Sequence, residues 1–107
     1  MTREEFTEQI CRLILRMREE GEAPILDYVK RWAEEQNRLY MAGLSKCDGY
    51  VKISQHQRGR AADIYFLDQS RGAGLAAPIH GHEYWHEVWE EMGGKPMIDW
   101  DQGHFEG

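Results

Sequence analysis

Long apolar runs are missing from this 107-residue chain. No stretch approaches the roughly 20 apolar residues that a membrane-spanning helix needs. The N-terminus begins with charged residues, such as Arg3 and Glu4, in place of the apolar core of a signal peptide. The sequence therefore predicts a protein that is made in the cytoplasm and does not enter a membrane, and any export would need another route.

An excess of basic residues is also missing. Lys and Arg number 13 against 19 Asp and Glu, which gives a net charge of −6. A nucleic-acid-binding domain normally carries a basic stripe, and Arg58 and Arg60 are too few to make one. We therefore expect no nucleic-acid partner.

Cysteine is scarce, with Cys11 and Cys47 as the two examples. They lack the close spacing of a cysteine-based metal site, and two free thiols in a reducing compartment are the default for such a chain. Whether they pair depends on the fold. The length fits one domain with a single modest core, and we expect a monomer.

The apolar pattern predicts alternating helices and strands. Residues 3–20 form an amphipathic helix, with Thr2 and Glu5 as a capping box and Gly21 as its end. The later expected elements are a strand at 25–29, a helix at 32–42, a buried strand at 62–67, a glycine-rich loop at 68–81, a helix at 82–92 and a strand at 97–100. The prediction is a small α+β domain over residues 1–107, with an N-terminal helix at 1–22 and a core at 24–106.

Three residues offer the ligands of a catalytic zinc ion. Such an ion takes three protein ligands and keeps one position open for water. His56, Asp63 and His104 supply two imidazoles and one carboxylate. Asp101 precedes His104 by three residues, where a carboxylate can act as general base without occupying the metal. Asp99 competes with Asp101 for this role.

The spacing between the first two ligands requires a turn. Seven extended residues span roughly 23 Å, so the chain must double back between His56 and Asp63. Gly59 can adopt the backbone angles of such a turn, and Ala61 leaves room for a close approach. The sequence thus predicts a tight turn just after His56.

These residues follow a motif with a known counterpart. The motif reads Ser54-x-His56-x-x-Gly59-x-Ala61-x-Asp63, then Asp101-x-x-His104-Phe105-Glu106, and upstream Arg31-x-x-x-x-Gln36-x-x-Leu39-Tyr40-x-x-Gly43-x-Ser45. It resembles the zinc D-alanyl-D-alanine carboxypeptidase family, which includes the VanX- and VanY-like peptidases and the L-alanyl-D-glutamate endopeptidases of phage endolysins. The resemblance covers residues 24–106. It implies helices packed on an antiparallel sheet, as in Hedgehog and DD-peptidase-like proteins, with the zinc site at the sheet edge.

The resemblance also implies roles for single residues. His56, Asp63 and His104 would bind one zinc ion, and Asp101 would be the catalytic base. Three further residues would act on the substrate. Arg31 would polarise the substrate carbonyl or hold a carboxylate, and Ser54 and Gln36 would bind substrate, with Ser54 alternatively supporting a ligand. Trp32 stands where the family often has a small polar residue.

The implied activity is hydrolysis of an amide bond in the peptide stem of peptidoglycan, with muropeptides as substrates. The sequence leaves open whether the bond is L-Ala-D-Glu, D-Ala-D-Ala or a cross-bridge, and whether the gene is phage or bacterial. We expect action on the cell wall in lysis or remodelling, with a holin-type pore as the route of release. The alternative is a non-catalytic, metal-stabilised module that binds the wall.

A second metal pattern lies at His82-Glu83-Tyr84-Trp85-His86, which fits the His-Glu-x-x-His signature of zincin-type proteases. The signature fixes only three positions, and a zincin needs more chain after it than remains here. The helical pattern places His82 and His86 on the flank nearest solvent, and His80 is expected at the surface too; at most, the three contribute to the rim of the cleft. Four aromatic residues are expected in the core: Trp85, Trp89, Trp100 and Phe105.

Overall fold

The computed structural model describes residues 1–27, 33–50 and 54–107. Three helices and a small antiparallel sheet make up this part of the chain, which confirms the α+β prediction. The elements follow in the order α1 (Arg3–Glu19), β1 (Pro24–Leu26), α2 (Ala33–Met41), β2 (Ala61–Leu67), β3 (Leu75–Ala76), α3 (His82–Glu91) and β4 (His104–Glu106).

The strand β2 is the centre of the sheet, and it pairs antiparallel with the other three strands. Its later half pairs with β1 and β3, and its first half pairs with β4. In the register with β4, Asp63 stands opposite His104. Directly opposed residues have Cβ atoms about 4.5–5.5 Å apart, so this pairing joins two predicted ligands from distant parts of the chain.

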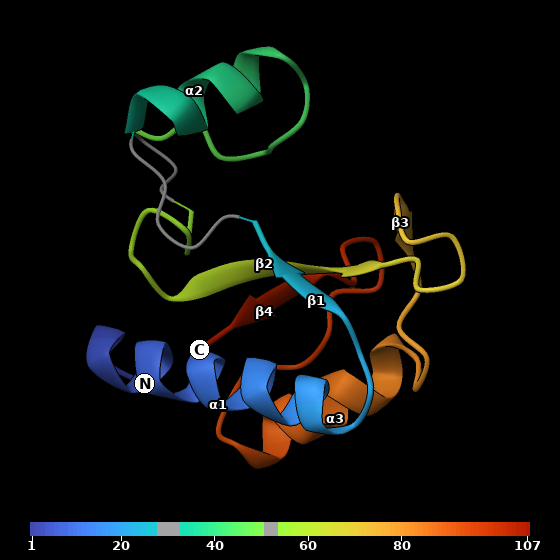
Figure 1. Ribbon diagram of the computed structural model, residues 1–107. Coiled ribbons are helices and arrows are strands. Elements are labelled where there is room, and N and C mark those ends of the chain that lie inside the picture. The colour runs from blue at the N-terminus through green and yellow to red at the C-terminus, as the bar shows by residue number, and fades with distance from the viewer. Residues whose placement is uncertain (28–32, 51–53) are drawn as a thin grey trace.

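The helices α1 and α3 cover one face of the sheet, while α2 lies on the other side (Figure 1). Successive side chains of a strand point to opposite faces. Ala62, Ile64 and Phe66 therefore face the helices and join the core, and Asp63 and Tyr65 point the other way. The core is built from Phe6, Ile10, Leu13, Met17, Ala62, Ile64, Phe66, Trp85, Val88, Trp89 and Phe105.

The helix α1 forms as its sequence predicts. The hydroxyl of Thr2 accepts a hydrogen bond from the Glu5 amide, and the Glu5 carboxylate accepts one from the Thr2 amide. This reciprocal capping satisfies amides that the first turn leaves free. At the other end the chain turns at Gly21, which has a φ of +89°. The buried stripe of α1 then packs against the sheet and α3.

The sequence-based strand at 97–100 is wrong. Ile98 forms one isolated bridge with Asp101, and residues 99 and 100 make a turn between them. The last strand is β4, and β3 lies within the segment expected to be a loop. These strands of two or three residues are too short to show a period of two, so pairing with β2 defines them. The predicted strand at 25–29 begins at Pro24, and its residues 28 and 29 lie outside the described part, as does Trp32.

Trp100 corrects a further expectation. Its side chain is 76% exposed, whereas Trp85, Trp89 and Phe105 are buried in the core as predicted. The turn at residues 99 and 100 carries Trp100 away from the core. Both cysteines are free thiols in this structure. Across residues 1–27, 33–50 and 54–107, no helix combines the length and the apolar character that a bilayer crossing requires.

Candidate metal site

A tight turn delivers the first ligand, as the spacing predicts. The Gly59 amide donates to the His56 carbonyl at 3.1 Å, and the Arg60 amide donates to the Gln55 carbonyl at 3.0 Å. Gly59 has a φ of +68°, a conformation that costs a residue with a side chain roughly 1–2 kcal/mol. The turn reverses the chain directly before β2, so His56 folds back over Asp63.

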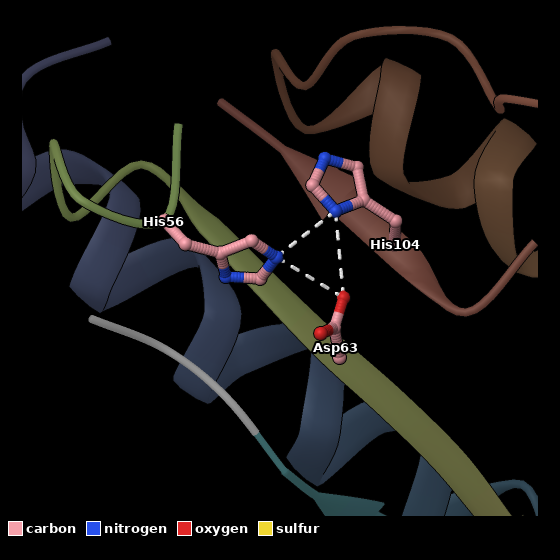
Figure 2. Close-up of side chains that lie close together, drawn as sticks. All are labelled: His56, Asp63 and His104. Atoms are coloured by element: carbon pink, nitrogen blue, oxygen red, sulfur yellow. Dashed lines mark hydrogen bonds and ion pairs between the residues drawn. The ribbon is translucent and has the colours of Figure 1, made fainter. Parts of the chain in front are cut away.

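The three predicted ligands meet in a near-equilateral triangle (Figure 2). Nε2 of His56 lies 3.2 Å from Oδ1 of Asp63 and 3.2 Å from Nδ1 of His104, and the last two atoms are 3.4 Å apart. Ligand atoms at about 2.0–2.1 Å from a tetrahedral zinc lie about 3.3 Å from one another. The spacing and the donor set both fit zinc, although several divalent metals accept imidazole and carboxylate ligands.

This triangle is distinctive within the molecule. Among the residues that the structure describes, His56, Asp63 and His104 form the only group of three or more His, Cys, Asp or Glu side chains close enough to share a metal ion. His56 and Asp63 are buried, and His104 is mostly buried. Three polar side chains gathered in a buried position cost free energy unless they are partnered. In this structure the three side chains contact one another, and a bound cation would satisfy all three at once.

The charges of the group reinforce one another. Burial raises the pKa of Asp63, but hydrogen bonds from His104 and His56 more than offset it and hold that pKa well below the ordinary range. Burial lowers the pKa of His104, but the carboxylates of Asp63 and Glu106 outweigh burial and raise it. Asp63 is therefore ionised at neutral pH, as a metal ligand must be.

Glu106 fixes the orientation of the His104 ring. Nε2 of His104 donates to Oε1 of Glu106 at 2.9 Å, because a carboxylate can only accept. When the ring is neutral, as metal binding requires, it carries its proton on Nε2 and can present the lone pair of Nδ1 to the metal position. Metal-binding histidines commonly use a carboxylate in this way. The motif contains Glu106 but predicts no role for it. Its position two residues after His104, on the same face of a strand, could have indicated this contact.

Gln36 and Ser54 hold the surrounding loops together. The Gln36 amide nitrogen donates to Oγ of Ser45 at 2.6 Å and to the Cys47 carbonyl at 2.9 Å, and its oxygen accepts from Oγ of Ser54 at 2.9 Å. Gln36 is 0% exposed, so these bonds tie α2 to the segment that carries His56. Substrate binding by Gln36 and Ser54 stays a prediction, and the buried position of Gln36 favours a supporting role.

The triangle lies in a cleft of about 740 Å³ between the sheet and the loop after α2. Ser54 and Asp101 line this cleft together with the three ligands, so the predicted base faces the same cleft as the candidate metal position. Of the two described aspartates that compete for this role, Asp101 lines the cleft and Asp99 does not. Arg31, the other predicted catalytic residue, lies outside the described residues.

The two histidines of α3, His82 and His86, differ from their predicted surface positions, whereas His80 just before the helix does not. His80 is exposed as expected, but His82 is half-buried and His86 is 2% exposed. Nε2 of His86 donates to the Gln102 carbonyl at 2.7 Å, and its ring stacks on Phe105 with centroids 4.0 Å apart. Packing between α3 and the C-terminal segment buries this flank, which a single-helix pattern cannot reveal. His86 thereby anchors the segment that carries Asp101 and His104.

The zincin pattern gains no support from this arrangement. Within the described residues, His82 and His86 belong to no group of three potential ligands. Burial lowers the pKa of His86 despite its bond to the Gln102 carbonyl, and burial also lowers the pKa of His82. Both imidazoles are therefore neutral side chains at neutral pH, packed between the helix and its neighbours.

Comparison with known proteins adds no relative to this picture. No family model matches the chain, and no curated protein matches it. The evidence for a function therefore comes from the motif residues and from the geometry that brings them together.

Proposed function

We propose that this protein is a zinc metallopeptidase that hydrolyses an amide bond in the stem peptide of peptidoglycan. The observation that supports it best is the triangle of His56, Asp63 and His104, whose sides of 3.2–3.4 Å fit a three-ligand zinc site. Asp101 lines the same cleft. The order of these residues is similar to that of the D-alanyl-D-alanine carboxypeptidase and L-alanyl-D-glutamate endopeptidase family, as in phage endolysins.

The site residues have different roles in the proposed hydrolysis. His56, Asp63 and His104 would hold a zinc ion, which when bound would supply Lewis-acid activation of water and of the substrate carbonyl. Asp101 takes the proton of the attacking water and returns it to the leaving amine. Arg31 is assigned to the substrate carbonyl or to a substrate carboxylate.

The test is digestion of purified peptidoglycan and muropeptides, followed by mass spectrometry, with and without a chelator. The zinc-loaded protein should release a defined peptide fragment, and the chelator, His56→Ala and Asp101→Asn should each abolish release. Asp99→Asn is the matched control and should stay active. Removing residues 104–107 would be a weaker test, because Phe105 belongs to the core.

The result also decides between the alternatives. A protein that binds one zinc ion and the wall but leaves every muropeptide intact would be a non-catalytic, metal-stabilised wall-binding module. If His82→Ala lost zinc and His56→Ala kept it, the zincin interpretation would replace the proposed one. Mass spectrometry would at the same time identify the bond that is cut.

A further inference from the structure

The mouth of the metal cleft carries an exposed aromatic ring with a cation over it. Trp100 lines the cleft and also lines a smaller neighbouring cleft of about 370 Å³. Nζ of Lys46 lies 5.4 Å from the centre of the Trp100 ring, within the distance of a cation–π interaction. Lys46 follows α2 and Trp100 precedes β4, so the contact joins two distant segments of the chain beside the metal ligands.

The exposed position of Trp100 contributes little to the stability of the fold. Burying a large apolar side chain contributes about 1.5–3 kcal/mol to stability, yet 76% of this one faces solvent. The turn at residues 99 and 100 holds it at the cleft, next to Asp101. An exposed indole at the rim of a cleft offers a flat apolar surface to a ligand, and Tyr and Trp are common in such positions.

Lys46 is a basic residue in a cleft whose other charged lining residues are acidic. Among the described residues that line it, four are carboxylic acids, Asp27, Asp63, Asp101 and Glu106, and Lys46 is the one Lys or Arg side chain. Asp63 faces the candidate metal, and Glu106 bonds to His104. A carboxylate on a ligand would be repelled by the acidic residues and attracted by the Lys46 ammonium. The charge pattern therefore allows an anionic group at one end of the cleft.

We propose that Lys46 and Trp100 form a subsite for the carboxylate of the substrate residue that supplies the leaving amine. This inference rests on the proposed peptidase function and narrows its substrate class. In both L-Ala-D-Glu and terminal D-Ala-D-Ala, the residue after the cleaved bond carries a free carboxylate on its α-carbon. Lys46 pairs with that carboxylate, which leaves Arg31 for the substrate carbonyl, and the Trp100 ring orients the ammonium and covers the apolar part of the residue. A peptide without this carboxylate is a poorer substrate.

The test uses two pairs of synthetic stem peptides. One pair has the α-carboxyl group of D-glutamate after L-alanine free or as a carboxamide, and the other has the carboxyl group of the terminal D-alanine free or as a carboxamide. In the pair that wild-type, zinc-loaded protein cleaves, the free acid should be preferred. Lys46→Met should lower kcat/KM for the free acid about fivefold, through KM, as expected for an exposed ion pair. The same substitution should leave kcat/KM for the carboxamide peptide unchanged.

Two variants sharpen the comparison. Lys46→Glu should favour the carboxamide over the free acid. Arg12→Met removes an exposed cation from α1, far from the cleft lining, and controls for the loss of one positive charge. Equal effects of Lys46→Met on both peptides, or the same change in Arg12→Met, would overturn the subsite.

Binding separates this inference from the proposed function. Calorimetry with the zinc-loaded Asp101→Asn variant measures the affinity for each peptide without turnover. If wild-type protein cleaves no peptide, the peptidase function fails, but tighter binding of the free acid that depends on Lys46 would still support the subsite. If the free acid binds no better than the carboxamide, or neither binds, the subsite is overturned even where cleavage is observed.

Discussion

Two buried carboxylates of this protein, Glu22 and Asp63, differ in what surrounds them. Glu22 is 2% exposed and Asp63 is 7% exposed. In both, burial raises the pKa of the carboxyl group, and hydrogen bonds more than offset that effect, so the pKa ends below its ordinary value. Both side chains are therefore ionised at neutral pH inside the protein. Burial and charge alone do not distinguish a structural carboxylate from a metal ligand.

The partners of the two carboxylates make the distinction. Glu22 accepts from the indole of Trp85 at 2.7 Å and from the amides of Ile79 and His80 at 2.8 and 3.1 Å, and it also lies 3.0 Å from Nδ1 of His80. Three of these four partners can only donate, and Glu22 belongs to no group of three potential metal ligands among the described residues. Asp63 instead faces the imidazoles of His56 and His104, whose nitrogens bind metals once they lose their protons. The neighbours thus favour a structural role for Glu22 and make Asp63 a candidate metal ligand.

The largest expected effect is loss of metal when the Asp63 cluster is changed. Asp63→Asn and His56→Ala each remove one of three ligands, and zinc affinity should fall by well over the roughly 10–100-fold that losing a supporting residue costs. Calorimetric titration with zinc measures it. Glu22→Gln is the matched control and should retain one zinc ion per chain. A comparable loss of zinc in Glu22→Gln would contradict the distinction.

A smaller effect should follow from removing the support of His104. Glu106→Gln weakens the acceptor of the Nε2 proton, and we expect zinc affinity to fall about 10–100-fold. Lys95→Met is the control. Nζ of Lys95 lies 3.7 Å from the other oxygen of Glu106, so this substitution removes a neighbouring charge and leaves the bond from His104 intact. Titration of both variants compares them. Equal zinc affinities in Glu106→Gln and wild type would show that Glu106 does not position the ring.

Changing Glu22 should affect stability and not metal binding. Glu22→Gln puts an amide group, which itself donates, among several donors, and a buried donor without a partner costs about 1–3 kcal/mol. Chemical denaturation at pH 7 should show a free energy of unfolding lower by that amount. The metal-free protein should be used for both variants, so that zinc binding does not mask the difference. An unchanged free energy of unfolding would mean that water or rearrangement satisfies the cluster.

The acid sensitivity of the metal-free protein should depend on Glu22. Its folded-state pKa is below the ordinary value of 4.5, so its contribution is complete above pH 4.5 and is lost as pH falls through the lowered pKa. Denaturation curves across that range should therefore converge for wild type and Glu22→Gln as the pH falls. A constant difference between the two proteins would contradict this assignment.

The smallest effect concerns the turn that delivers His56. Gly59→Ala forces a side chain into a positive φ and should cost roughly 1–2 kcal/mol of stability. Gly43→Ala is the control, since Gly43 has a φ of +75° and nothing lies within 4 Å of an added Cβ atom. Both variants should lose similar stability, but only Gly59→Ala should weaken zinc binding. Equal zinc affinities would show that the turn does not set the position of His56.

The sequence by itself determined the local features of this protein. The periodic apolar stripe and the Thr2–Glu5 capping box define α1, because a helix depends on contacts a few residues apart. The need for a turn at Gly59 follows from chain length and backbone sterics. The ligand set was implied by the motif and its resemblance to the carboxypeptidase family, and the structure brings its three members together.

The tertiary structure decided what depends on contacts between distant segments. The register that opposes Asp63 to His104, the burial of His86 and the exposure of Trp100 each arise where the C-terminal segment meets β2 or α3. No local pattern encodes such contacts, because a three-residue strand or one helix flank takes its environment from its neighbour. The same reason separates Glu22 from Asp63: two ionised carboxylates look alike in a sequence, and the folded chain decides which donors surround each one.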